Sequence, residues 1–390
     1  MSERAYFDWN ATTPLRVEAR AAMAAALGLT GNASSVHTEG RAARQQVEAA
    51  RMQVAGLIGA DPKNITFTSG ATEANMLALT PLLELSGRKE PRDRLFVSAI
   101  EHPSVLRGGR FDASAVEKLP VTAEGLVDLT GLAGALARGE RPLVSVMLAN
   151  NETGVIQPVR AIADIVHAAN GILHVDAVQG AGRIDCDIES LGADLMSLSS
   201  HKLGGPQGAG ALIRHNTKFG DIHIAQPLIT GGGQERGLRA GTENVAAVAG
   251  FGAACAAADR ARQVDASRMA RLRDQFETAL KETASNTVIF GQATQRLPNT
   301  SLFTIPGLKA ETAVISFDLN GIALSSGAAC SSGKVQASHV LTAMGVAPDL
   351  ARGAVRVSLG WTTAERDVEM LLNAWKRVVS SLLKNHANAA

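Results

Sequence analysis

The sequence predicts an α/β fold in which a mostly parallel sheet is covered by helices on both faces. Three observations predict it: short strands that are apolar throughout, helical patterns between these strands, and 38 glycines among 390 residues, as in proteins rich in tight turns. A chain of this length can bury a large core and commonly divides into two domains.

Helical and strand patterns alternate along the first part of the chain. Residues 40–60 are predicted to form a helix whose apolar stripe is Val47, Val54, Leu57 and Ile58. Residues 64–79 predict a β-branched strand, a Ser-Gly turn and a helix. Further apolar strands are expected at 94–100, 143–149, 172–177 and 194–200, with helical stretches such as 159–170 between them.

The pattern changes near Asn244, where an alanine-rich segment runs into an amphipathic helix followed by shorter strands at 299–305 and 355–360. The last helical pattern has one apolar face, made by Val368, Leu371, Leu372, Trp375, Val379 and Leu382. We place a boundary region at 244–263. Residues 15–256 are expected to form a large domain, and residues 1–14 with 257–390 a smaller α+β domain.

Composition excludes several classes of protein. Lys plus Arg total 38 against 37 for Asp plus Glu, so no overall charge points to nucleic acid or to a membrane surface. No apolar run reaches the roughly 18 residues of a membrane span. The N-terminus lacks a secretory signal, and three widely spaced cysteines form neither a disulfide framework nor a metal-ligand pattern. We therefore expect a cytoplasmic protein with no metal site.

Polar residues stand at the ends of five apolar strands. In an open parallel sheet, ligands bind outside the carboxyl ends of the strands, so these residues should converge in space. Each cluster alone could be ordinary turn or cap chemistry, but together they supply an amine, an imidazole and a carboxylate. The clusters are Ser69 to Thr72, Glu101 with His102, Asn150 to Glu152, Asp176 with Gln179, and Ser199 to Lys202.

The clusters match the needs of pyridoxal phosphate. Gly70 and the amides of Ala71 and Thr72, at a helix start, favour a phosphate, although no Walker motif is present. Ser199 and His201 could add a second anion contact.

The same clusters supply groups for the aldehyde and the ring of this cofactor. Its aldehyde needs a reactive lysine, for which Lys202 is available, and its ring nitrogen needs a carboxylate, for which Asp176 is available. Gln179 could reach the ring hydroxyl, and His102 could lie on the ring face.

Nine motifs in order make the chain resemble the cysteine desulfurases of the NifS/IscS group, which are class V, fold-type I enzymes that use pyridoxal phosphate. The resemblance covers nearly the whole chain and implies a large domain with a seven-stranded type of sheet. The motifs are ATTPL, GNASSVHTEGRAAR, TSGATEAN, EHPSVL, ANNETGVIQPV, HVDAVQ, SSHKLGGPQGAGAL, GGGQERGLRAGTENV and SSGAACSSG. Ala33 and Gln207 depart from the residues common in the group.

The resemblance implies a role for each matching residue. Lys202 should hold the cofactor as an internal aldimine, Asp176 should pair with the pyridinium, and His102 should stack on the ring. Gln179 and Asn151 should bond the cofactor hydroxyl and the substrate region, and Arg356 should clamp the substrate carboxylate. The expected phosphate ligands are Ala71, Thr72, Ser199 and His201, together with Thr242, which should reach the phosphate of the neighbouring subunit of a homodimer.

The resemblance gives Cys330 the role of nucleophile. Glycine and serine around it predict a mobile loop, whereas Cys186 and Cys255 read as buried structural thiols. The implied reaction removes sulfur from L-cysteine, giving L-alanine and a persulfide on Cys330 that passes to an acceptor such as an iron–sulfur scaffold protein. Two points stay open: whether that persulfide ever ligates a cluster, and whether His102 serves as the acid or base for Cys330.

Two other functions remain open from the sequence. A selenocysteine lyase or another class V aminotransferase would share the cofactor motifs, although transamination needs no loop thiol. A nucleotide-binding or non-catalytic sulfur-handling scaffold would use residues 230–237 for phosphate, but it leaves Lys202 and Asp176 without a linked purpose.

Overall fold

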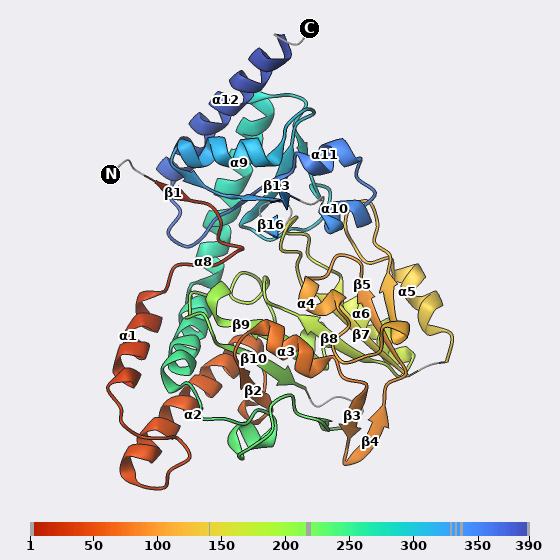
Figure 1. The fold of residues 1–390 in the computed structure, drawn as a ribbon, viewed down its shortest axis with the longest axis vertical. Helices are drawn as coiled ribbons and strands as arrows, with labels where there is room; N and C mark the ends of the chain where they lie inside the picture. The colour runs from red at the N-terminus through yellow and green to blue at the C-terminus, as the bar shows by residue number, and fades with distance from the viewer. Residues whose placement is uncertain are drawn as a thin grey trace.

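The computed structural model describes residues 4–139, 141–215, 220–327, 330–331, 334–335 and 338–387. A seven-stranded sheet forms the centre of its larger part, in the order β2-β10-β9-β8-β7-β5-β6 (Figure 1). The strands are β2 Ile65–Thr68, β5 Arg94–Ser98, β6 Val116–Leu119, β7 Pro142–Met147, β8 Ile172–Asp176, β9 Leu195–Ser199 and β10 Gly210–Arg214.

The prediction of a mostly parallel sheet is confirmed. Strands β6, β5, β7, β8 and β9 pair in parallel, and β10 alone runs antiparallel to its two neighbours, β9 and β2. Residues 200–209 join β9 to β10, and this connection is shorter than the dozen or more residues that a parallel crossover usually takes. This short connection therefore returns the chain as an antiparallel strand.

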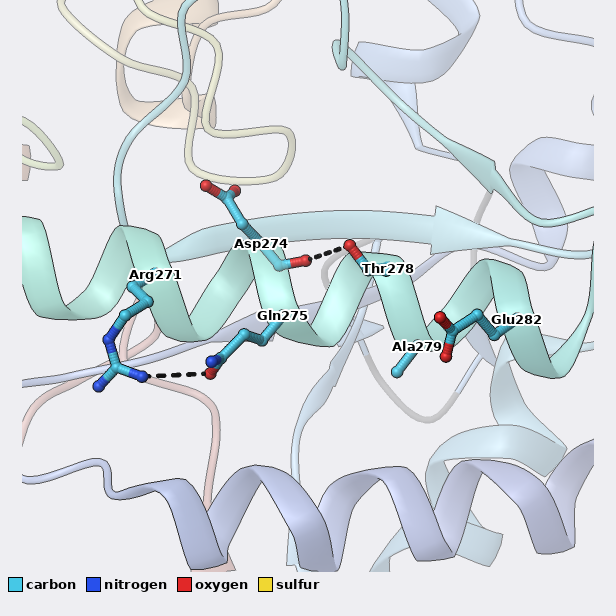
Figure 2. Close-up of a pocket in the computed structure, with 6 residues that line it drawn as sticks. All are labelled: Arg271, Asp274, Gln275, Thr278, Ala279 and Glu282. Atoms are coloured by element: carbon cyan, nitrogen blue, oxygen red, sulfur yellow. Dashed lines mark hydrogen bonds between the residues drawn. The ribbon is translucent and has the colours of Figure 1, made fainter.

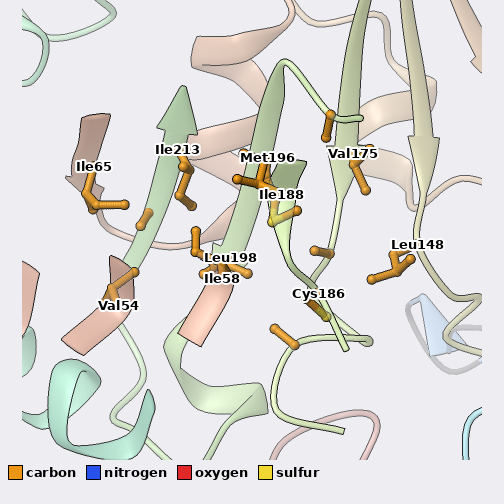
Figure 3. Packing of buried hydrophobic residues seen from close by; sticks show 14 of the residues in the cluster. Val54, Ile58, Ile65, Leu148, Val175, Cys186, Ile188, Met196, Leu198 and Ile213 are labelled. Atoms are coloured by element: carbon orange, nitrogen blue, oxygen red, sulfur yellow. The ribbon is translucent and has the colours of Figure 1, made fainter. Parts of the chain in front are cut away.

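Helices cover both faces of this sheet because its strands are apolar on both sides. On β9, Met196 and Leu198 join the cluster that includes α2, while Leu195 joins a second cluster with Leu77 of α3. Figure 3 shows the first cluster, where Val54 and Ile58 of α2 lie near Leu198. The helices here are α2 Thr38–Ile58, α3 Ala71–Ala78, α4 Pro103–Leu106, α5 Leu129–Leu136, α6 Val159–Ala168 and α7 Ile188–Leu191.

A smaller sheet in the order β12-β13-β18-β15 lies in the upper part of Figure 1. Its core is a separate cluster that includes Phe303 and Trp375, whose rings meet edge to face at a centroid distance of 5.3 Å. The elements of this part are β12 Val288–Ile289, β13 Thr300–Thr304, α9 Ala310–Leu319, β14 Ile322–Ala323, β15 Ser325–Ser326, β16 Cys330–Ser331, β17 Lys334–Val335, α10 His339–Ala343, α11 Pro348–Arg352, β18 Val355–Ser358 and α12 Glu365–Ala387.

The long helix α8 (Val245–Thr283) connects the two parts. It is continuous through the region where the sequence predicts a boundary. Phe251 and Cys255, in its first half, pack in the cluster of the large sheet, whereas Leu272 and Phe276, in its second half, pack in the cluster of the small sheet. The division at residue 256 stays a prediction, and no break in the helix marks it.

A three-stranded sheet in the order β11-β3-β4 was not expected from the sequence; its strands are β11 Ile222–Ile224, β3 Leu82–Leu85 and β4 Arg88–Pro91. Ser86 and Gly87 join β3 to β4, and both have positive φ angles, 47° and 78°. Two such residues form the tight hairpin loop that matches the twist of the flanking strands. The remaining helical elements are α1 Val17–Leu27, η1 Pro62–Asn64, η2 Ala113–Ala115, η3 Ser200–Lys202 and η4 Gln234–Gly237.

The N-terminal segment crosses from the small sheet to the loop after β9. Strand β1 (Ala5–Tyr6) pairs with β14, and the amide of Ser358 donates to the carbonyl of Phe7 at 2.8 Å. Farther along, the amide of Thr13 donates to the carbonyl of His201 at 3.0 Å. Residues 8–13 therefore lie between the two parts of the molecule. Over the described residues, no helix is both long and apolar enough to cross a membrane.

Candidate active site

A cavity of about 1050 Å³ opens at the carboxyl ends of the large-sheet strands, between that sheet and the smaller part of the protein. It gathers residues that are far apart in the sequence, as the strand-end rule predicts. The predicted residues that line it are Ala71, Thr72, His102, Asn151, Asp176, Gln179, Ser199, His201, Lys202 and Arg356.

Lys202 lies on η3, directly after β9, and its amine faces the N-terminal segment. The Nζ atom donates to the carbonyl of Asn10 at 2.5 Å and to that of Ala11 at 2.7 Å. Burial lowers the pKa of Lys202 to about 7, and the nearby cations Arg356 and Arg183 act in the same direction. A substantial share of this amine is therefore neutral, and so nucleophilic, near pH 7.

Asp176 ends β8, and both of its carboxylate oxygens are held. The side chain is only 6% exposed. Asn75 Nδ2 donates to Oδ2 at 2.8 Å, and the amide of Val178 donates to Oδ1 at 3.1 Å. Donors on both oxygens fix the orientation of the carboxylate. The sequence analysis missed Asn75; the only signal in the sequence was an amide inside the otherwise apolar part of α3.

His102 precedes α4 and caps it. Its Nδ1 atom accepts from the amide of Ser104 at 3.2 Å and lies 2.8 Å from Ser104 Oγ. The ring stands at the cavity wall, yet the surrounding protein still lowers the pKa of His102 through desolvation, against the opposing charge of Asp176. Near neutral pH the neutral imidazole is favoured.

Gln179 binds the N-terminal segment. Its Nε2 donates to the carbonyl of Asn10 at 3.0 Å, and its Oε1 accepts from Arg183. Asn151 contributes its main-chain carbonyl, which accepts from Asn10 Nδ2 at 3.2 Å. The contacts predicted for Gln179 and Asn151 with a cofactor hydroxyl stay predictions.

The start of α3 lines one end of the cavity, where the sequence predicts that a phosphate binds. The first amides of a helix, here those of Ala71 and Thr72, have no partner within the helix. Strand β10 passes very close to this turn. A Cβ atom added to Gly210 would lie only 2.6 Å from Gly70 Cα. His201 completes this end; Thr12 Oγ1 lies 3.1 Å from its Nδ1, and burial lowers its pKa to about 4.

Arg356, on β18, faces this site from the smaller part of the protein. Its Nη2 pairs with Asp8 Oδ1 at 2.7 Å, and its Nη1 donates to the carbonyl of Asn151 at 2.9 Å. Its Nε is buried and has no hydrogen-bond partner among the described residues. A guanidinium that lines this cavity is suited to a ligand carboxylate.

Two buried carboxyl groups of the predicted strand-end clusters, Glu101 and Glu152, have partners on α10 that the sequence analysis did not foresee. Ser338 Oγ donates to Glu152 Oε2 at 2.5 Å, and His339 Nε2 donates to the carbonyl of Glu101 at 2.9 Å. Burial raises the pKa of Glu152 to about 7 and that of Glu101 to about 8. Ser338 and His339 begin α10, so these bonds attach α10 to the strand ends.

Two predicted residues are not among those that line the cavity. The side chain of Cys330 lies outside the described residues, although Ser325, Ser326 and Gly327, which precede it in sequence, line the cavity. Thr242 is exposed, so its predicted contact with a neighbouring subunit stays a prediction. Cys186 and Cys255 are buried with raised pKa values, as expected for structural thiols.

A second hollow, of about 640 Å³, lies along one side of α8 (Figure 2). Arg271 and Gln275, which line it, bond each other on consecutive turns of that helix, at 3.4 Å. It brings together none of the predicted site residues. Among the described residues, no group of three or more His, Cys, Asp or Glu could hold a metal ion.

Comparisons with known proteins agree with this geometry. The model of the family "Aminotransferase class-V" matches residues 5–371. "Cysteine desulfurase IscS" of Dictyoglomus turgidum is 39% identical over 98% of this chain and 96% of its own length. "Cysteine desulfurase IscS 1" of Archaeoglobus fulgidus is 39% identical, with 97% of each chain covered.

A solved structure is similar over the same extent. The NifS-like protein of Rickettsia africae superposes with a TM-score of 0.85 at 36% identity, covering 97% of this chain and 100% of that one. Both the sequence relatives and the structure therefore span the whole fold. The chain belongs to the class-V aminotransferase family and, within it, to the NifS/IscS group of cysteine desulfurases.

Proposed function

We propose that this protein is a cysteine desulfurase that uses pyridoxal 5′-phosphate. The observation that carries the proposal is the pairing, in one cavity, of an amine whose pKa is lowered to about 7 with a carboxylate fixed by donors on both oxygens. Lys202 and Asp176 meet the two chemical needs of this cofactor, an imine-forming amine and a partner for a protonated ring nitrogen.

The remaining residues of the cavity fit the same cofactor. Ala71 and Thr72 at the start of α3, with Ser199 and His201 opposite, would hold its phosphate. His102 would lie on the ring, and Gln179 and Asn151 would bond the ring hydroxyl and the substrate. When bound, pyridoxal phosphate supplies the electron sink that acidifies the Cα–H of an amino acid.

The protein side chains then bind the substrate and move its protons. Arg356 would bind the α-carboxylate of L-cysteine through its Nη groups, displacing Asp8 or the carbonyl of Asn151. Lys202 Nζ, which is buried and largely uncharged above pH 7, would take the Cα proton and hold it for return. Asp176 would stay beside the ring nitrogen, held by Asn75 and by the amide of Val178.

Cys330 would take the sulfur. Its thiolate attacks the sulfur of L-cysteine, the bond between that sulfur and Cβ breaks, and Cβ gains a proton as L-alanine forms. The net change is L-cysteine plus the Cys330 thiol giving L-alanine plus a Cys330 persulfide, so atoms and electrons balance. The thiolate is the reactive form, and this step therefore needs a group that accepts the thiol proton.

Several wider features belong to the same proposal. The enzyme would act as a homodimer in which Thr242 reaches the phosphate of the neighbouring subunit. The persulfide would pass to an acceptor such as an iron–sulfur scaffold protein in the cytoplasm. The large domain would comprise residues 15–256, and the small domain residues 1–14 with 257–390.

The test is an assay of L-alanine formed from L-cysteine, with mass spectrometry of the peptide that carries Cys330. We expect alanine from the wild type and an added sulfur on Cys330 after one turnover. Cys330→Ser should still bind cofactor and cysteine but release no sulfide. Alanine from selenocysteine alone would favour a selenocysteine lyase, and normal sulfide release by Cys330→Ser would remove Cys330 from the mechanism.

A further inference from the structure

A chain of hydrogen bonds runs inside the protein from Asp176 to His102. Asn75 Nδ2 lies 2.8 Å from Asp176 Oδ2 and 3.0 Å from Ser104 Oγ. Ser104 Oγ in turn lies 2.8 Å from His102 Nδ1. The chain joins the ends of β8 and β5 through α3, and Asn75, at its centre, is completely buried.

The carboxylate determines the direction of every bond in this chain. An ionised Asp176 has no hydrogen to give, so the amide of Asn75 must turn its NH₂ group toward it. The second hydrogen of that NH₂ group then points to Ser104 Oγ, which acts as an acceptor. The hydroxyl hydrogen of Ser104 is thereby left to be donated to His102 Nδ1.

A second donor reaches the same nitrogen of His102. The main-chain amide of Ser104 points at Nδ1 from 3.2 Å, because His102 caps α4. A nitrogen that accepts two hydrogen bonds carries no hydrogen of its own. The ring hydrogen of neutral His102 must therefore be on Nε2.

The charges around the ring favour this neutral form. Desolvation lowers the pKa of His102, and Lys202 and His339 lower it further, while Asp176 is the charge that opposes them. Adding a proton to Nδ1 would also place an N–H against two donors. Both the electrostatic surroundings and the hydrogen bonds to Nδ1 thus favour neutral His102.

We propose that Asn75 and Ser104 are positioning residues that hold His102 as the Nε2–H tautomer, so that His102 offers the cavity a fixed N–H donor and does not serve as a base. The proton stays on Nε2 during turnover, and the proton of Cys330 goes elsewhere. The statement about turnover rests on the proposed function, whereas the statement about the tautomer does not.

Nuclear magnetic resonance of protein with ¹⁵N-labelled histidine rings tests the tautomer directly. The chain has nine histidines, and the signal lost in His102→Gln identifies His102. We expect one protonated nitrogen, Nε2, at neutral pH and above. An Nδ1–H tautomer, or a doubly protonated ring at neutral pH, would overturn the proposal.

Variants of Ser104 test the hydrogen-bond chain. Ser104→Ala removes the hydroxyl donor but keeps the main-chain amide, so the pKa of His102 should rise and some Nδ1–H form should appear. Ser104→Thr keeps the hydroxyl and should leave the histidine spectrum as in the wild type. Unchanged His102 signals in Ser104→Ala would show that Ser104 and Asn75 do not set the tautomer.

Kinetics of alanine formation test the role in turnover. His102→Gln loses the ring that would lie on the cofactor but retains an N–H donor near the position of Nε2 and cannot act as a base, so it should lose clearly less activity than His102→Ala. His102→Ala loses the donor and should fall by about 100-fold or more. Equal losses of about 100-fold or more in both variants would indicate a base and overturn the donor role. A wild type that forms no alanine would refute the proposed function and leave the tautomer result standing.

Discussion

The two walls of the cavity are held in place in different ways. On the large-sheet wall, Asp176, Asn75 and His102 are bonded to one another or through Ser104, all within the same layer of strands and helices. On the opposite wall, three polar residues reach across to another part of the protein. Arg356 bonds Asp8, Ser338 bonds Glu152, and His339 bonds the carbonyl of Glu101.

This difference indicates that the two walls have different functions. On the first wall, Asp176 and His102 are oriented by contacts within that wall, so these two groups have defined positions before any ligand arrives. The other proposed cofactor ligands, Lys202, Gln179 and His201, also bond residues 10–12 of the N-terminal segment. The second wall, which carries the proposed substrate clamp and both ends of the segment with Cys330, depends on bonds to the first wall and to residues 8–13. Changes to these hydrogen bonds and ion pairs should affect substrate binding and sulfur transfer more than cofactor binding.

The largest effect is expected from removing the amine of the first wall. Lys202→Ala should lower alanine formation by about 10⁴-fold or more, because both the covalent attachment and the proton carrier are lost. Steady-state assays with added pyridoxal phosphate measure it. The surface variant Lys63→Ala is the control and should match the wild type. Turnover in Lys202→Ala within tenfold of the wild type would contradict the assignment.

Replacing Arg356, the proposed carboxylate-binding residue of the second wall, should have the next largest effect on turnover of cysteine. Arg356→Lys loses the forked geometry that holds a carboxylate, a loss of about 1.5–3 kcal/mol, so KM for cysteine should rise about 10- to 100-fold. Cofactor affinity should not change. Arg352→Lys, on the exposed face of α11, is the matched control. An unchanged KM, or a loss of cofactor, would show that the two walls are not separate in function.

Breaking the link between α10 and the strand ends should give a smaller loss. Ser338→Ala removes the donor to Glu152 and the cap of α10, and we expect persulfide formation to slow by about tenfold. Ser338→Thr keeps the hydroxyl and should stay near the wild-type rate. Rapid-quench mass spectrometry of Cys330 measures the rate. Equal rates in all three proteins would mean that this link does not position the Cys330 segment.

The last effect concerns the pH dependence of folding stability at Glu101 and not the rate of turnover. Burial raises the pKa of Glu101 to about 8, so folded Glu101 keeps a proton that the unfolded chain releases near its ordinary pKa of about 4.5. The stability contributed by this proton is present below about pH 4.5 and is lost as pH rises toward 8. Glu101→Gln cannot titrate.

Denaturant unfolding at pH 5 and pH 9 measures this difference. The wild type should lose about 4 kcal/mol more of its free energy of unfolding between these two pH values than Glu101→Gln does. Parallel pH dependence in the two proteins would show that Glu101 is ionised in the folded state.

The sequence predicts the first wall better than the second. Strand ends of a parallel sheet meet at one edge, so Asp176, His102 and Lys202 could be brought together from periodicity and the strand-end rule alone. The sequence did not identify Asn75 and Ser104 as site residues, because a buried amide and a serine at a helix start look ordinary until their neighbours are known. The partners Asp8 and Glu152 depend on packing between distant segments, which no local pattern encodes.

The fold shows the same limit. Apolar strands indicated the large sheet, but the antiparallel direction of β10 follows from the length of residues 200–209, and the β3–β4 hairpin depends on Ser86 adopting a positive φ angle. The continuous α8 runs through the expected boundary region, and it buries its first half in one core and its second half in another.

The central claim is that Lys202 is the residue that carries the cofactor. Borohydride reduction of the yellow enzyme, followed by peptide mass spectrometry, tests it most directly. We expect the mass of reduced pyridoxal phosphate on the peptide that contains Lys202 and on no other. A label on a different lysine, or no label on enzyme that forms alanine, would contradict the account.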